Sequence, residues 1–230
     1  MRSKYSTLAN SCFLFILLAF TANAQSTSPP PAKMGYLRFW DMLPPTNGSF
    51  ELRKAGASES EQSLLTGSAY EYSSYVEFAG GKYQLAVFKK GDRKTPLKLV
   101  NIDLKPDTFF TVIVSPKGGV LTVEVFDDTN DPKATTGTLT IRNYFTGLTV
   151  DVSSGTKKIV DALPYGQSYI ATGLPAGKLP LTLRTKLPNG IPAESGAEAD
   201  FNASTRATLL IIPDSYGRFR PRVTIDGKNR

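Results

Sequence analysis

Oxygen-bearing side chains gather near the middle of the chain, where Asp127, Asp128 and Asp131 lie together with Asn130. Carboxylate and amide oxygens are the ligands that Ca²⁺ prefers, so this cluster predicts a calcium site. Its spacing does not match an EF-hand loop, and acidic residues that simply hydrate a turn account for the same sequence. A carboxylate pair could also catalyse hydrolysis, although a linker is a poor setting for it.

A second group of functional side chains lies near the C-terminus. Arg218, Arg220 and Arg222 alternate with Phe219 and Pro221, so in an extended segment the three guanidinium groups project from one face. Guanidinium groups bind carboxylates and phosphates through paired hydrogen bonds, which predicts a ligand-binding ridge. The alternative is an edge strand that charge and proline protect against aggregation.

The residue types that carry most enzyme chemistry are missing. The chain has no histidine, and its single cysteine, Cys12, lies in a segment predicted to be removed. A Ser-His-Asp arrangement, the usual zinc sites and a cysteine nucleophile are therefore excluded from the mature protein. We predict that the protein is not an enzyme and uses no cofactor.

The N-terminus has the pattern of an export signal. Arg2 and Lys4 precede an apolar run at residues 13–20, and small residues suited to cleavage follow. The run is much shorter than the roughly 20 residues that span a bilayer. The sequence therefore predicts a signal peptide over residues 1–24 and a periplasmic or secreted mature chain with no transmembrane segment. Residues 25–32, which include three prolines, predict an extended tether.

Charge is distributed unevenly along a chain whose net charge is +7. Residues 33–128 hold 12 basic and 12 acidic side chains, whereas residues 129–230 hold 13 basic and 8 acidic ones. This asymmetry predicts either an acidic partner for the second half or a solvated basic surface. Nucleic acid is a poor partner for an exported chain. Another basic cluster, at a predicted hairpin tip, is interpreted as solvated: Lys89, Lys90, Arg93 and Lys94.

Internal repetition is the most informative feature of the sequence. Segments of the first half recur in the second half in the same order, which chance similarity between strands does not produce. The matched pairs are 35–43 with 137–145, 78–85 with 174–181, 103–108 with 200–205, and 110–114 with 207–211. The repetition predicts one domain over residues 33–128, a linker over 129–134 and a similar domain over 135–230.

Each unit shows the pattern of β-structure. Apolar residues alternate with polar ones, as in residues 121–125, and turn-forming residues recur about every ten residues. This pattern predicts an all-β fold of two tandem, similar β-sandwich (immunoglobulin-like) domains with about seven strands each. Trp40 and Tyr144 lie at equivalent strand ends, where they either meet a partner or pack at the rim of a sandwich.

The second unit contains Val150-Asp151-Val152, Tyr165-Gly166 and Leu174-Pro175-Ala176-Gly177. These motifs resemble those of bacterial secreted tandem β-domains of unassigned function. The layout of the whole chain is similar to that of the periplasmic accessory protein family of alginate O-acetylation (AlgF-like).

The resemblance implies a non-enzymatic adaptor. Its partners would be periplasmic or membrane proteins of a polysaccharide-modifying complex, or an acidic polysaccharide. The alternative is a generic cell-surface or extracellular structural or binding module. The resemblance implies no catalytic residue.

Overall fold

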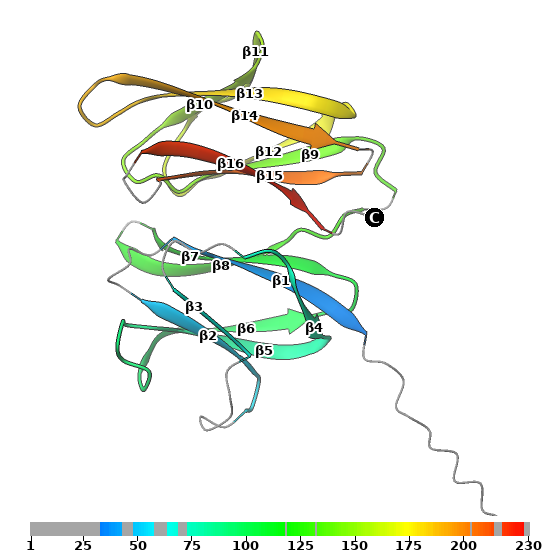
Figure 1. The fold of residues 1–230 in the computed structure, drawn as a ribbon, viewed down its shortest axis with the longest axis vertical. Coiled ribbons are helices and arrows are strands. Elements are labelled where there is room, and N and C mark those ends of the chain that lie inside the picture. Colours follow the sequence, from blue (N-terminus) through cyan, green and yellow to red (C-terminus); the bar gives the residue numbers. More distant parts are fainter. Residues whose placement is uncertain are drawn as a thin grey trace, which may run out of the picture. The chain divides into compact units, whose positions relative to one another are not determined.

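The computed structural model describes residues 33–42, 48–57, 64–68, 73–117, 119–131, 133–202, 204–213 and 218–227 (Figure 1). Within these ranges the regular structure is entirely β-strand. The all-β prediction is therefore confirmed. The predicted signal peptide (1–24) and tether (25–32) lie outside the described residues.

The strands fall into two successive sets. The first half contains β1 (Met34–Asp41), β2 (Ser49–Lys54), β3 (Leu65–Ser68), β4 (Val76–Ala79), β5 (Gly81–Phe88), β6 (Pro96–Leu104), β7 (Phe109–Lys117) and β8 (Val120–Asp127). The second half contains β9 (Gly137–Asn143), β10 (Val150–Ser154), β11 (Lys157–Leu163), β12 (Ser168–Leu174), β13 (Gly177–Lys186), β14 (Pro192–Phe201), β15 (Arg206–Pro213) and β16 (Phe219–Asp226).

Both halves have the same topology. The first half forms the sheets β4-β1-β7-β8 and β3-β2-β5-β6, and the second half forms β12-β9-β15-β16 and β11-β10-β13-β14. In each half the first strand pairs in parallel with the seventh, so that Leu37 lies opposite Phe110 and Leu139 opposite Ala207. Each half therefore has eight strands rather than about seven. The extra strand was hard to predict because β3 and β4 are only four residues long.

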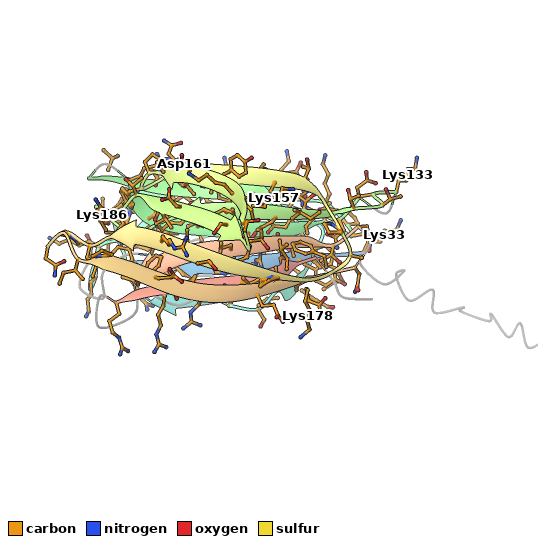
Figure 2. The ribbon with its side chains drawn as sticks, turned by 90° about the horizontal axis from the view of Figure 1, so that it is seen from above. Lys33, Lys133, Lys157, Asp161, Lys178 and Lys186 are labelled. Carbon is orange, nitrogen blue, oxygen red and sulfur yellow. The ribbon has the colours of Figure 1, made fainter. Side chains whose placement is uncertain are left out.

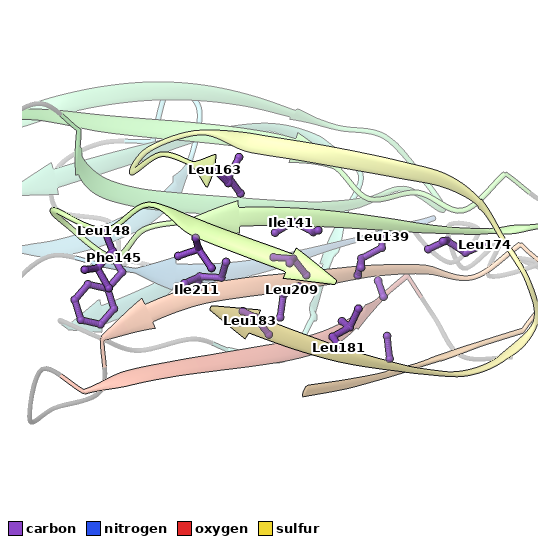
Figure 3. Close-up of a cluster of buried hydrophobic side chains, with 14 of the residues drawn as sticks. Leu139, Ile141, Phe145, Leu148, Leu163, Leu174, Leu181, Leu183, Leu209 and Ile211 are labelled. Carbon is purple, nitrogen blue, oxygen red and sulfur yellow. The ribbon is translucent and has the colours of Figure 1, made fainter. Parts of the chain in front are cut away.

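Each half has its own apolar core. The alternation of side chains along the strands points one face of each sheet inward, where the two sheets of that half pack together. In the first half this core includes Phe39, Leu52, Leu85 and Val112. In the second half, Leu139, Ile141, Leu183 and Leu209 meet between the sheets (Figure 3).

A third apolar cluster joins the two halves, which belong to one compact unit. The sheet of β1, β7 and β8 faces the sheet of β9, β15 and β16, so the four sheets lie as successive layers (Figure 1). We call this interface the seam. Its apolar side chains are Trp40, Met42, Ile113, Tyr144, Leu210 and Ile212, with Phe126 packed against them. Trp40 and Tyr144 are therefore packing residues, buried between the two halves of the chain.

Candidate functional site

The three arginines near the C-terminus lie on one exposed face. Arg218 directly precedes β16, and Arg220 and Arg222 lie within it. All three are exposed, whereas Phe219 and Val223 alternate with them and pack against the core of the second half. This alternation follows from the two-residue repeat of a strand. We call the three residues the arginine edge, because β16 is the edge strand of its sheet.

The arginine edge borders the seam. Arg222 lies opposite Leu210 and Arg220 opposite Ile212 in the ladder between β15 and β16. Directly paired residues share a face of the sheet, and Leu210 and Ile212 both belong to the apolar cluster of the seam. A long anionic ligand bound by these arginines would therefore run along the rim of the interface between the two halves.

The repeated fold provides a comparison for this edge. In β7–β8, Val112 lies opposite Val125, and in β15–β16 Leu209 lies opposite Val223. Val112 and Leu209 each pair with the first strand of their own half, at equivalent positions of that strand. This equivalence allows β8 and β16 to be aligned residue by residue. The residues of β8 that correspond to Arg218, Arg220 and Arg222 are Val120, Thr122 and Glu124. The same position in the fold thus forms without any of the three cations.

The acidic residues predicted as a calcium site have separate roles. The Asp127 carboxylate accepts a hydrogen bond from the backbone N–H of Thr129 (2.9 Å), and that of Asp131 accepts one from Lys133 (2.9 Å). Asp128 is 2 % exposed, and its carboxylate points toward other partners. In the described part of the chain, no three acidic side chains form a group that could hold a metal ion. The placement of Asp127, Asp128 and Asp131 therefore gives the calcium prediction no support.

The partners of Asp128 form a buried ionic cluster across the seam. The Nη2 atom of Arg38, in β1, donates to Asp128 Oδ2 (3.3 Å) and also to Asp226 Oδ1, at the end of β16. The Nε atom of Arg38 donates to the hydroxyl of Thr111 (2.6 Å). Arg38 is 3 % exposed and Asp226 1 %. One guanidinium therefore holds a carboxylate from each half of the chain.

The two carboxylates occupy equivalent places in the repeat. The Thr111 hydroxyl, in β7, donates to Asp128, and the Thr208 hydroxyl, in β15, donates to Asp226 Oδ2 (2.9 Å). The Tyr75 hydroxyl donates to Asp128 Oδ2 as well (3.0 Å). Buried carboxylates remain charged only if donors surround them, and these hydroxyls supplement the guanidinium.

Burial and mutual repulsion shift the acidities in this cluster. Burial and the neighbouring Asp128 charge together raise the pKa of the Asp226 carboxyl to about 6, although Arg38 opposes both effects. Burial also raises the pKa of Tyr75 well above its usual range, with Asp128 adding to the shift. On the other side of the seam, burial lowers the pKa of Arg142, whose guanidinium lies 3.3 Å from the ring centre of Phe126.

Arg38, Tyr75 and Asp226 were not predicted as functional residues. The repetition held part of a signal: the match of 110–114 with 207–211 places Asp128 one residue short of Asp226, and the ladders of the edge strands supply the one-residue shift that aligns the two. No local pattern points to Arg38, which lies 90 residues from Asp128 and 188 from Asp226.

Comparison with known proteins identifies no family. No family model matches the chain. No curated protein matches it either. Among solved structures, a "putative cell adhesion protein" from Bacteroides uniformis is 11% identical over 85% of this chain and 99% of its own, with a TM-score of 0.24. A protein of the same description from Bacteroides fragilis is 10% identical over 82% and 86%, also with a TM-score of 0.24. Likenesses this weak do not bear on function.

The described residues contain no helix that is long and apolar enough to cross a membrane.

Proposed function

We propose that this chain is a non-enzymatic extracellular binding module whose arginine edge holds an anionic partner. The observation that carries the proposal is the contrast between the two equivalent edge strands. Arg218 lies directly before β16, and Arg220 and Arg222 lie within it, whereas β8 has Val120, Thr122 and Glu124 at the same places.

This contrast weighs against a purely protective role for the arginines. An edge strand with exposed backbone groups needs some protection against pairing with other chains. β8 is also an edge strand and is formed with no arginine at the corresponding positions. Three cations at the start of one short strand therefore exceed what the repeated fold itself requires. A function of the second half explains the excess.

The chemistry of guanidinium indicates the kind of partner. Alternate residues of a strand lie about 6.5–7 Å apart, so the edge offers a row of positive charges to a row of negative ones. Carboxylates along an acidic polysaccharide meet this requirement, with each arginine able to form paired hydrogen bonds. The accessory role in polysaccharide modification that the sequence resemblance implies would involve the same class of ligand.

A non-enzymatic role is part of the proposal. The sequence has no histidine to act as a general base near neutral pH. Two buried carboxylates, those of Asp128 and Asp226, are occupied by Arg38 and the neighbouring hydroxyls. Binding rather than catalysis is the function that the exposed side chains support.

Replacing Arg218, Arg220 and Arg222 by serine tests the proposal. Each exposed ion pair contributes about 1 kcal/mol or less, so losing three should weaken binding to a polyuronate roughly ten- to a hundredfold. Binding by the unmodified protein should also fall as salt rises, because exposed charges are screened. Titration of the polymer by calorimetry measures both effects, and the melting temperature of the variant should stay nearly unchanged.

The matched control is the variant K133S/K157S/K186S. It removes three exposed lysines and the same total charge, from the surface positions labelled in Figure 2. If only net charge matters, both variants lose affinity equally and the proposal is wrong. Unchanged binding in the arginine variant together with aggregation on concentration would instead establish the protective role.

A further inference from the structure

The tip of the β5–β6 hairpin is strongly basic. Between the end of β5 and the middle of β6 the chain carries five cations and a single acid, Asp92. All five cations are exposed: Lys89, Lys90, Arg93, Lys94 and Lys98. The backbone N–H of Asp92 donates to the carbonyl of Lys89 (2.9 Å), which closes the turn. The tip is thus an ordered part of the fold that presents its charges together.

The two acids that the structure describes close to this tip, Asp92 and Glu51, offset little of its charge. The Asp92 carboxylate accepts hydrogen bonds from the backbone N–H groups of Lys94 (2.8 Å) and Thr95 (3.3 Å), so its role is to shape the turn. Glu51 is buried and forms an ion pair with Arg53 (2.6 Å), at a longer distance from Arg93 (3.5 Å). Among the described residues, the tip therefore carries an excess of positive charge.

Two leucines are exposed beside these cations. Leu97 is 56 % exposed and Leu99 50 %, whereas Ile102 and Leu104, further along the same strand, pack in the core. Leu97 is the extra residue of a β-bulge, because Val87 pairs with Lys98 while Phe88 pairs with Pro96. A bulge redirects side chains, and here it leaves Leu97 in solvent at the basic end of β6, the edge strand of its sheet.

The equivalent hairpin of the second half lacks this combination. Its turn spans residues 187–191. The backbone N–H of Leu187 donates to the carbonyl of Ile191 (2.9 Å), and that of Gly190 donates to the carbonyl of Leu187 (2.8 Å). Ile191 is 56 % exposed, but no cation lies between Leu187 and Ala193. The fold therefore forms this hairpin without clustered cations, so the basic and apolar tip of the first half is a property of its sequence.

We propose that the β5–β6 tip docks on an anionic lipid surface, with the cations contacting lipid phosphates and Leu97 and Leu99 entering the interfacial region. Basic residues flanking exposed apolar side chains are the combination that binds such surfaces. The charge attracts the tip and the leucines retain it. This surface is distinct from the arginine edge, which lies on the other half and has no exposed leucine in β16.

Vesicle sedimentation with the purified protein tests the proposal. Vesicles of equal parts phosphatidylglycerol and phosphatidylcholine should bind the protein, and vesicles of phosphatidylcholine alone should not. The L97S/L99S variant should bind the anionic vesicles about tenfold more weakly, as expected when two half-exposed leucines lose their burial in lipid. The K89S/K90S/K94S variant should bind about a hundredfold more weakly.

Two controls separate docking from general adhesion. I191S removes an equally exposed apolar residue from the equivalent hairpin, and K133S/K157S/K186S removes the same charge elsewhere; both should bind vesicles as the unmodified protein does. Vesicle binding that is indifferent to Leu97 and Leu99, or equally weakened by the controls, would overturn the proposal. Unchanged emission from Trp40 in the seam shows that each variant is folded.

The same variants keep this proposal separate from that for the arginine edge. If both are right, L97S/L99S retains its affinity for a soluble polyuronate, and the arginine-edge variant retains the leucine-dependent part of vesicle binding. Loss of both activities in both variants would contradict two independent surfaces.

Discussion

Asp226 illustrates how much a single buried residue depends on its surroundings. Its carboxylate is held by Arg38 and Thr208 and lies near Asp128. Burial disfavours the ionised carboxylate, and the two carboxylates that share one guanidinium also repel each other. The folded protein therefore retains a proton on Asp226 to higher pH than the unfolded chain does.

The stability of the protein should consequently fall between pH 4 and pH 7. A raised carboxyl pKa of about 6, against 3.8 in the unfolded chain, stabilises the fold fully below pH 3.8 and loses that effect as pH rises through 6. The contribution of Asp226 is at most about 3 kcal/mol. In Asp226→Asn this part of the pH dependence should vanish, as measured by urea unfolding at several pH values.

The exposed residue Asp200 provides the control for this experiment. Asp200→Asn should keep the pH dependence of the unmodified protein. A curve for Asp226→Asn that still declines between pH 4 and pH 7 would show that another group is responsible.

Asn143 shows a different role for a buried polar side chain. The sequence places Asp41 and Asn143 at equivalent strand ends, and both are fully buried. The Asn143 amide donates to the carbonyls of Leu148 (2.9 Å) and Leu163 (3.0 Å) and accepts from the N–H of Phe145 (3.0 Å). It therefore fastens the loop after β9. The strand-end position was predictable, but these partners were not.

At the scale of single elements, the first strand of each half has a glycine at or next to its start for a steric reason. A Cβ added to Gly137 would lie 2.5 Å from the Phe201 ring, and one added to Gly35 would lie 2.6 Å from Leu104 and from the Lys105 carbonyl. Both glycines begin the segments that match between the two halves. In both halves, therefore, the backbone of the first strand lies in close contact with the end of the sixth strand.

Gly137→Ala should destabilise the protein by about 1–3 kcal/mol, because the buried Phe201 ring has to move in a filled core. Chemical denaturation followed by circular dichroism measures the change. Gly196→Ala is the matched control: its nearest contact would be an ordinary 3.9 Å, and the backbone there is extended. A Gly137→Ala variant as stable as Gly196→Ala would mean that β9 and β14 can separate without cost.

At the scale of the whole molecule, the buried ionic cluster ties one half to the other. Arg38 comes from the first half, and its partners Asp128 and Asp226 come from one half each. The same guanidinium lies 4.3 Å from the ring centre of Trp40, the single tryptophan of the chain. Tryptophan emission therefore reports on the seam directly.

Arg38→Met should destabilise the protein by about 3–5 kcal/mol at pH 7, because it leaves two buried carboxylates without their cation. The loss should be smaller at pH 5, where Asp226 is mostly protonated. Unfolding followed by Trp40 emission measures both values. Arg184→Met breaks an exposed ion pair with Glu194 and should cost less than about 1 kcal/mol. Equal effects of the two substitutions would show that the cluster does not hold the halves together.

The sequence by itself determined the fold class, the repetition and the exposed alternation of Arg218, Arg220 and Arg222. These features depend on short-range rules: the two-residue repeat of strands, the conformations of turn formers and the order of matched segments. The lack of histidine likewise restricted the possible chemistry through composition alone.

Only the tertiary structure decided what Asp128 does, which residue neutralises it and where Trp40 and Tyr144 pack. Those contacts join positions as far apart as 188 residues, and they exist because the outer faces of two sheets stack against each other. The alternation of apolar and polar side chains along a strand shows the character of each face. It does not show whether that face contacts solvent, a partner protein or a second sheet. The choice among these depends on how the two halves meet, which no local pattern encodes.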